Sequence, residues 1–130
     1  MKKIIFLFIS VLALSACHES LEDRAEREAK EFTMKNCPMP VNEYITVDSM
    51  VYEKTARTIH YYYTIKGQAD TTGISNDAAR EGLLKSLKDN TSIKKFKEEG
   101  FNFAYTYFSA KNKGKKLIDF TFYPKDYNEK

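Results

Sequence analysis

Several residue types that carry common enzyme chemistry are scarce in this chain. Among 130 residues it has no tryptophan, two cysteines, two histidines and five glycines. His18 and His60 stand far apart, and no His or Cys recurs at the spacing of metal ligands, so we expect no metal site. Phosphate-binding loops, dinucleotide fingerprints and Gly-x-Ser-x-Gly elbows are also missing. The sequence therefore predicts no catalytic residues and no cofactor.

Long apolar runs are equally scarce, and the one that exists lies at the start of the chain. Met1 to Lys3 is basic, and residues 4–16 are almost wholly apolar. A basic start, a short apolar core and small residues at the end are typical of a secretory signal peptide. The run is shorter than the ~20 apolar residues that a membrane-spanning helix needs. We therefore predict that residues 1–16 form a cleaved signal peptide.

The residues that end this run, Leu14-Ser15-Ala16-Cys17, resemble the lipobox of bacterial lipoproteins. The resemblance implies that Cys17 is lipidated, with acyl chains such as palmitate, and that the mature chain spans residues 17–130. One acyl chain holds a protein only marginally on a membrane, whereas two or more give a stable anchor. His18 stands where that family carries Asp as an inner-membrane retention signal, which favours the outer membrane, on its periplasmic or surface side. The alternative is a secreted protein with a chance cysteine.

Removal of the signal peptide leaves a nearly neutral domain. Lys2 and Lys3 leave with it, so 19 basic side chains stand against 18 acidic ones. Nucleic-acid-binding domains usually carry a basic patch or stripe, so this balance argues against a nucleic-acid partner. If Cys17 carries lipid, Cys37 has no disulfide partner in the chain. A hydrophobic core, with nine Phe and nine Tyr to supply it, must therefore hold the fold together.

Hydrophobic spacing predicts a single α+β domain. Apolar residues at helical spacing, ended by Pro38 and Pro40 in the first case and by Gly100 in the last, predict helices over residues 19–36, 78–88 and 91–99. Alternating residues predict strands over 45–54, 58–66, 101–110 and 115–123. The order α-β-β-α-β-β, with two hairpins each preceded by helix, favours a four-stranded antiparallel sheet with helices packed on one face.

This arrangement loosely resembles a group of small uncharacterised bacterial secreted proteins. The shared features are the proline-bearing exit of the first helix, the Tyr-x-Tyr-Thr-Ile that ends the first hairpin, and the Phe-x-Phe-x-Tyr-x-Tyr that opens the second. The resemblance supports the fold and implies no activity.

The strand patterns divide the side chains between two faces of the sheet. Over residues 58–65 we assign Ile59, Tyr61, Tyr63 and Ile65 to the core, which leaves His60, Tyr62 and Thr64 on the opposite face. Over residues 45–54 the pattern is mixed. It indicates either a strand that is partly covered on both faces, with Val47 and Val51 on the same side, or a β-bulge.

The tyrosine on the opposite face suggests a binding surface. Tyrosine combines apolar area with a polar tip and is common at recognition sites. If no helix covers that face, His60, Tyr62 and Thr64 form a candidate surface for a protein, peptide or glycan ligand. The alternative is a half-exposed strand of ordinary composition.

Three functions remain open at this point. The leading hypothesis is a lipid-anchored, non-catalytic binding module of the cell envelope. A second is a small envelope enzyme that uses Cys37 as a nucleophile, which needs a base or a positive charge close to the thiol. A third is a structural or envelope-assembly component without a small ligand. Burial of Tyr62 and its neighbours would contradict the first hypothesis, and the absence of a base within reach of Cys37 would contradict the second.

Overall fold

The computed structural model describes residues 19–72 and 75–129. Within these residues the chain forms helices and strands in the following order: α2 (Leu21–Asn36), β1 (Met39–Pro40), β2 (Ile45–Glu53), β3 (Thr58–Ile65), α3 (Gln68–Thr72), α4 (Asn76–Asp89), the 3-10 turn η1 (Thr91–Ile93), α5 (Lys94–Glu98), β4 (Asn102–Ser109), β5 (Lys116–Phe122) and α6 (Pro124–Tyr127).

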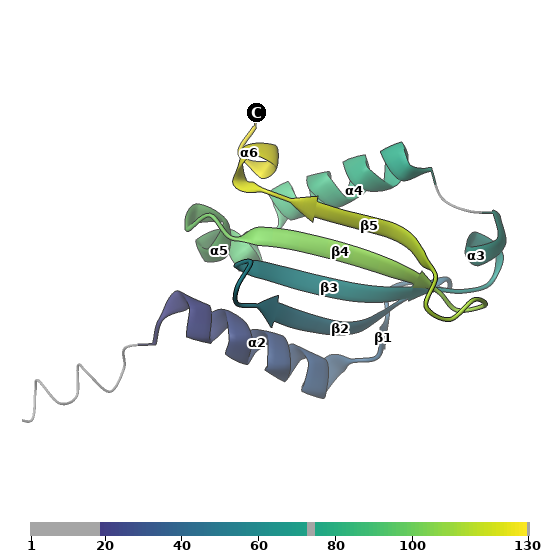
Figure 1. The fold of residues 1–130 in the computed structure, drawn as a ribbon, viewed down its shortest axis with the longest axis horizontal. Helices are drawn as coiled ribbons and strands as arrows, with labels where there is room; N and C mark the ends of the chain where they lie inside the picture. The colour runs from purple at the N-terminus through teal and green to yellow at the C-terminus, as the bar shows by residue number, and fades with distance from the viewer. Residues whose placement is uncertain (1–18, 73–74, 130) are drawn as a thin grey trace, which may run out of the picture.

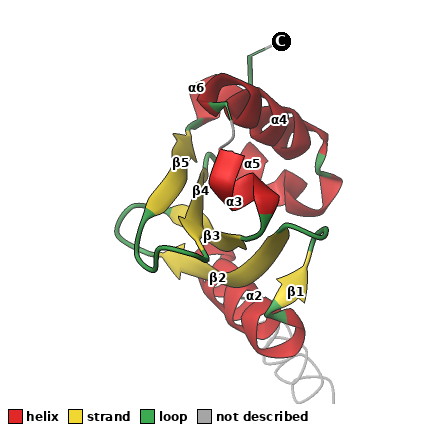
Figure 2. Cartoon of the chain, turned by 90° about the vertical axis from the view of Figure 1, so that its right-hand side faces the viewer, coloured by secondary structure: helices red, strands yellow, loops and turns green. Residues whose placement is uncertain are grey.

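The domain has two layers, a twisted sheet and a set of helices that lie on one of its faces (Figures 1 and 2). α2 packs on β2, near one edge of the sheet. α4 lies on the same face near the opposite edge, beside β5 and α6. The aromatic core fills the space between the layers, with Phe101, Phe103 and Phe122 fully buried. Among the described residues, every buried hydrophobic residue lies between Ala25 and Tyr127.

The sheet has five strands in the order β1-β2-β3-β4-β5, and one of its pairs is parallel. The predicted α+β class and helices on one face are confirmed, but a four-stranded, wholly antiparallel sheet is wrong in two respects. Met39 and Pro40 add a short edge strand beside β2. β3 and β4 run parallel because the helical connection from residue 66 to residue 101 returns the chain to the end where β3 began.

α2 begins and ends at the residues that local chemistry requires. The Ser20 side chain caps the helix by accepting a hydrogen bond from the backbone N–H of Asp23, and the helix ends before Pro38. The four-residue spacing of Glu26 and Lys30 predicts an ion pair, and the two do pair, with 3.3 Å between Lys30 Nζ and Glu26 Oε1. These contacts account for the bounds of the helix.

The four-residue spacing of Asp23 and Arg27 also predicts an ion pair, and this prediction is wrong. Arg27 instead binds Glu19, with 2.9 Å between Arg27 Nε and Glu19 Oε1, and its Nη1 lies 3.6 Å from Glu31 Oε1. Glu19 precedes the first turn of the helix, and both of its carboxylate oxygens accept hydrogen bonds from the Arg27 guanidinium. Such a two-bond pair is stronger than a single contact.

A β-bulge in β2 decides which side chains face the core. The pairing of β2 with β3 shifts between Val47 and Ser49, so Asp48 is the extra residue. The bulge puts Val47 on the buried face, opposite Tyr63, and Val51 on the other face, opposite His60. The expectation that Val47 and Val51 share a side is therefore wrong, and the alternative of a bulge is confirmed.

Candidate functional site

The predicted anchor lies outside the described residues. Cys17 and the predicted signal peptide precede residue 19, where the description of the fold begins. Lipidation of Cys17 stays a prediction. Over residues 19–72 and 75–129, no helix combines the length and apolar character required to cross a bilayer.

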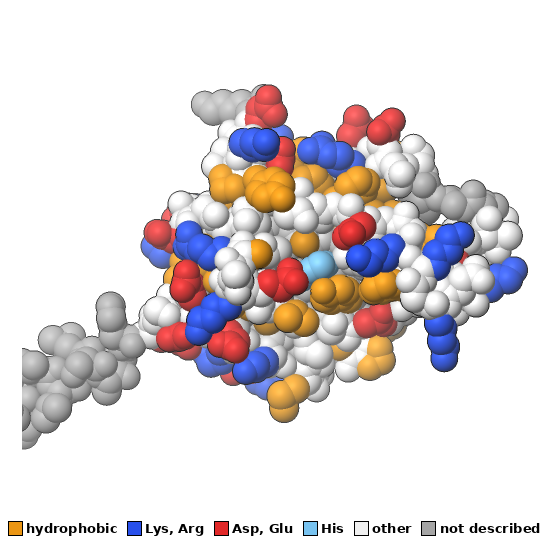
Figure 3. Space-filling view, viewed as in Figure 1, with side chains coloured by type: hydrophobic (Ala, Val, Ile, Leu, Met, Phe, Trp, Pro, Cys, Tyr) orange, Lys and Arg blue, Asp and Glu red, His pale blue; other side chains and the backbone are white. Residues whose placement is uncertain are grey.

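The structure places His60, Tyr62 and Thr64 together on the face of the sheet that carries no helices. We call this surface the open face. All three side chains are half-buried. The ring of His60 stacks on the ring of Tyr62 at 4.1 Å, and Tyr62 lies parallel to Phe108 at 6.3 Å, so three rings form a row across β3 and β4. The open face faces the viewer in Figure 3, where a histidine lies between acidic side chains.

A chain of polar contacts crosses the open face from β2 to β5. His60 Nδ1 lies 2.8 Å from Glu53 Oε1, and His60 Nε2 lies 2.7 Å from Thr106 Oγ1. The Thr106 hydroxyl in turn donates to Asp119 Oδ1 at 2.8 Å. Because the threonine has one proton and gives it to Asp119, its oxygen accepts from His60 Nε2, while His60 Nδ1 also lies 3.2 Å from the Tyr62 hydroxyl. The array therefore links Glu53 to Asp119 through His60 and Thr106.

This array of carboxylate, imidazole and hydroxyl has the connectivity of a nucleophilic triad, but its surroundings do not suit catalysis. Thr106 is only 1% exposed, so a substrate cannot reach its hydroxyl. The proton that a base must remove already points at Asp119. The array instead joins four strands through their side chains.

Cys37 does not have the surroundings of a reactive thiol. Burial and the nearby Asp48 carboxylate raise the pKa of the Cys37 thiol above its ordinary value. A nucleophilic cysteine needs the opposite shift, because the thiolate is the reactive form. In the part of the chain that the structure describes, no three His, Cys, Asp or Glu side chains gather as metal ligands do.

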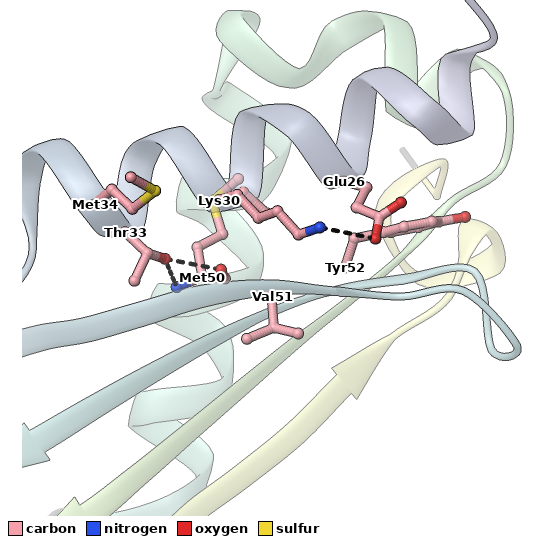
Figure 4. Close-up of a pocket in the computed structure, with 8 residues that line it drawn as sticks. Glu26, Lys30, Thr33, Met34, Met50, Val51 and Tyr52 are labelled. Carbon is pink, nitrogen blue, oxygen red and sulfur yellow. Dashed lines mark hydrogen bonds and ion pairs between the residues drawn. The ribbon is translucent and has the colours of Figure 1, made fainter.

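An apolar groove runs between α2 and β2 (Figure 4). Its volume is about 360 Å3, and Ala29, Met34, Met50 and Val51 supply most of its apolar lining. Met34 is 84% exposed and Val51 is 43% exposed, which is unusual for side chains of this kind. Val51 points to the side of β2 away from α2 (Figure 4), next to His60 of the open face. The groove and the open face therefore meet at Val51.

The outer edge of β2 is only partly closed. Thr33 Oγ1 donates to the carbonyl of Met50 and accepts from its N–H, both at 2.9 Å, and so replaces a neighbouring strand at this position. In an antiparallel ladder, residues two apart direct their backbone groups the same way, so those of Tyr52 also point outward. Apart from its pairing with β3, Tyr52 has no backbone hydrogen bond to another described element. At this edge, Thr33 thus occupies the outward backbone groups of Met50, whereas those of Tyr52 are left without such a partner.

Two hollows lie between α4 and the sheet. The tyrosine hollow, of about 290 Å3, has four core-facing tyrosines and α4 residues in its lining: Tyr61, Tyr63, Tyr105, Tyr107, Leu83 and Ser86. The aliphatic hollow, of about 340 Å3, adjoins it and is lined mainly by apolar or small residues: Ile45, Ala78, Ala79, Gly82, Leu83 and Ile118. The hollows share Ile45, Leu83, Ser86 and Tyr107, so they lie side by side along α4.

The tyrosines of this hollow stand in two stacked pairs. Tyr61 and Tyr105 lie 5.2 Å apart between ring centres, and Tyr63 and Tyr107 lie 4.3 Å apart. Burial raises the pKa of Tyr61, Tyr105 and Tyr107 well above that of a free phenol. The hydroxyls of Tyr61 and Tyr105 make no hydrogen bond to any described residue.

Sequence reasoning assigned Tyr61 and Tyr63 to the core and missed the hollow. The signal that could have shown it is the choice of residue: phenylalanine fills a core position without a hydroxyl that needs a partner.

Comparison with solved structures finds the same fold in proteins of low sequence identity. A Pseudomonas aeruginosa protein classed as secreted is 21% identical, with a TM-score of 0.69 over 84% of this chain and 98% of its own. EpsS, a type 2 secretion system pilotin of Vibrio vulnificus, is 13% identical, with a TM-score of 0.67 over 85% and 94%. AspS, a type II secretion system pilotin of Vibrio cholerae, is 12% identical, with a TM-score of 0.62 over 82% and 91%.

Comparison of the sequence adds a family but no activity. No curated protein matches the chain in sequence. The model of one family matches residues 20–118, which is more than half of the chain and includes the described elements from α2 to β4. The chain therefore belongs to the family described as a domain of unknown function, DUF8479.

Proposed function

We propose that this protein is a lipid-anchored accessory protein of the bacterial cell envelope that binds a segment of a partner protein and catalyses no reaction. The observation that carries the proposal is the incompletely closed edge of β2. There an apolar groove, two exposed apolar side chains and the free backbone groups of Tyr52 lie together. The shared fold supports an envelope role, since two of the structural neighbours are pilotins of type II secretion systems.

The chemistry of the groove fits a short extended segment with apolar side chains. Main-chain groups of such a segment can pair with a free strand edge, while its side chains enter an adjacent pocket. Methionines at the rim, such as Met34, adapt their shape to different side chains. Glu26 and Lys30 neutralise each other beside the groove, so the partner needs no particular charge there.

The proposed contact extends from the groove onto the open face. Val51 lines the groove and pairs across the strands with His60, which stacks on Tyr62. A segment that leaves the groove over Val51 would next meet His60, Tyr62 and Thr64. We therefore keep these three residues in the proposed binding surface, as its outer part.

Site-specific photo-crosslinking in cells tests this proposal. A photoreactive amino acid is introduced in place of Met34 or of Val51, and the matched control carries it in place of Lys85, an exposed side chain on α4. We expect the same protein to be captured from positions 34 and 51 but not from position 85. Capture of the same proteins from all three positions, or of none from 34 and 51, would contradict the assignment of the site.

The anchor is tested separately. We expect Cys17→Ser to move the protein from the membrane fraction to the soluble fraction, and mass spectrometry of the native protein to show acyl groups on Cys17. An unmodified Cys17 in the mature protein would remove the anchor from the proposal and leave the partner site unaffected.

A further inference from the structure

The hydroxyl of Tyr105 is a polar group of the tyrosine hollow that the fold itself does not use. Tyr105 is only 7% exposed, lines the tyrosine hollow and has no hydrogen-bond partner among the residues that the structure describes. Among those residues the one buried side-chain polar atom without a partner is Tyr52 Oη, so the Tyr105 hydroxyl reaches the open space of the hollow, where a ligand can meet it. Tyr61, which is stacked on Tyr105, presents a second such hydroxyl to the same space. The two hydroxyls can donate to an acceptor inside the hollow.

A second observation concerns Gly82, which lines the adjoining aliphatic hollow. It lies in the middle of α4, where glycine is less favourable than alanine. A Cβ added at this position would meet no atom within 4 Å, so no close approach of a neighbour requires glycine. The absence of a side chain at Gly82 leaves the space of the hollow open.

The two hollows differ in chemistry and follow each other along one helix. The tyrosine hollow offers hydroxyl donors, and the aliphatic hollow offers Ile45, Ala79 and Ile118. Together their size is that of sites for small molecules, which are mostly apolar with a few convergent polar groups. A molecule that fills both needs an acceptor at one end and an apolar chain at the other.

We propose that the two hollows form a binding site for a single-chain acyl compound, with its carbonyl or carboxylate oxygen at Tyr61 and Tyr105 and its chain beside Gly82. This site lies on the helix-covered side of the sheet and does not depend on the proposed function at the β2 edge. Burial keeps the phenols protonated at neutral pH, because it raises their pKa, so they act as hydrogen-bond donors to the acyl oxygen.

Titration of the chain from residue 19 with dodecanoate, followed by amide NMR, tests the site. A parallel titration uses a lysophospholipid with one dodecanoyl chain, each below its micelle concentration, to separate a free fatty acid from a membrane lipid as the source. We expect saturable shifts at the amides of Tyr61, Gly82 and Tyr105 with at least one of the two probes. Absence of saturable binding with both probes would overturn the proposal.

Two variants locate the binding. Gly82→Leu fills the aliphatic hollow and should abolish binding while the melting temperature stays the same or rises. Tyr105→Phe removes a single oxygen atom from the protein and should weaken binding by about tenfold, the loss expected for one hydrogen bond to a ligand. Tyr62→Phe, on the open face, is the matched control and should bind as the parent does. Unchanged affinity in both Gly82→Leu and Tyr105→Phe would place the probe elsewhere and overturn the site.

Discussion

Two helices cover the same face of the sheet, and they meet it in different ways. α2 lies close to β2: Ala25 and Ala29 are each 1% exposed, and Thr33 binds the backbone of the strand directly. α4 buries only Leu87 completely and leaves two hollows between itself and the sheet. The stacked tyrosines that line one of these hollows are large, whereas the contact residues of α2 are small.

This difference in packing implies that α2 contributes more to stability, whereas α4 leaves more space for a ligand. Alanines allow a helix backbone to approach a strand closely, so under α2 the open space is confined to the groove beside Met34 and Val51. Long side chains beneath α4 hold that helix away from the sheet and create room, at some cost in packing contacts. We therefore expect substitutions under α2 to affect folding strongly, and equivalent substitutions under α4 to be tolerated. The following predictions test this difference.

High pH should have the largest effect, because it acts on several tyrosines at once. The unfolded chain loses its phenol protons near pH 10, whereas burial raises the pKa of Tyr61, Tyr105 and Tyr107 in the folded chain. Above about pH 10 the folded state therefore holds more protons than the unfolded state, and stability is lost as the pH rises toward the folded pKa values. Urea unfolding at intervals from pH 8 to pH 11.5 measures this decline.

The double variant Tyr61→Phe/Tyr105→Phe provides the control. Lysines also titrate in this range, but the variant keeps them all and loses two of the buried phenols. We expect its stability to fall less steeply with pH than that of the parent. An identical slope would show that these tyrosines are not responsible.

Ala25→Leu should have the next largest effect. Ala25 is 1% exposed and lies outside the groove, so the added side chain has no space between α2 and the sheet, and overpacking of this kind costs about 1–3 kcal/mol. The matched substitution Ala79→Leu places the same group beside the aliphatic hollow and should change the free energy of unfolding by less than about 1 kcal/mol. Equal losses from the two substitutions, measured by urea unfolding, would contradict the difference between the helices.

Thr33→Val should cost about 1–2 kcal/mol, because the change in shape is small but both backbone groups of Met50 lose their partner. Thr33→Ser keeps the hydroxyl and should recover most of the stability. Urea unfolding of both variants measures how much the Thr33 hydroxyl contributes to stability. If Thr33→Val and Thr33→Ser were equally stable, the hydroxyl would contribute nothing.

The sequence predicted the elements of this fold better than their arrangement. Ser20, Pro38 and Gly100 act locally, so the ends of α2 and the stop after α5 were predictable from neighbouring residues. The parallel pair of β3 and β4 depends on the path of the connection between residues 66 and 101, which periodicity does not encode. The bulge at Asp48 was detectable only as a mixed pattern, because one extra residue reverses every later side chain.

The candidate sites were less predictable still. Alternation placed His60 and Tyr62 on one face correctly, but the contacts with Glu53, Thr106 and Asp119 join strands that are far apart in sequence. The groove beside β2 depends on where α2 lies, and the hollows depend on how far α4 stands from the sheet. Such distances are set by packing between elements, so no local pattern of residues reports them.

Gly82→Ala should have the smallest effect, and the opposite sign. Glycine inside a helix is less favourable than alanine by about 0.5–1 kcal/mol, and a Cβ at position 82 would contact nothing, so the substitution should stabilise the protein by about that amount. Thermal or urea unfolding measures the gain, and Ala79→Gly, in the same helix beside the same hollow, should cause a loss of similar size. Such a gain would show that folding does not require glycine at position 82, so its presence there needs another explanation. If Gly82→Ala instead destabilised the protein, the helix would need the glycine for its own backbone, and the open space beside it would have no separate explanation.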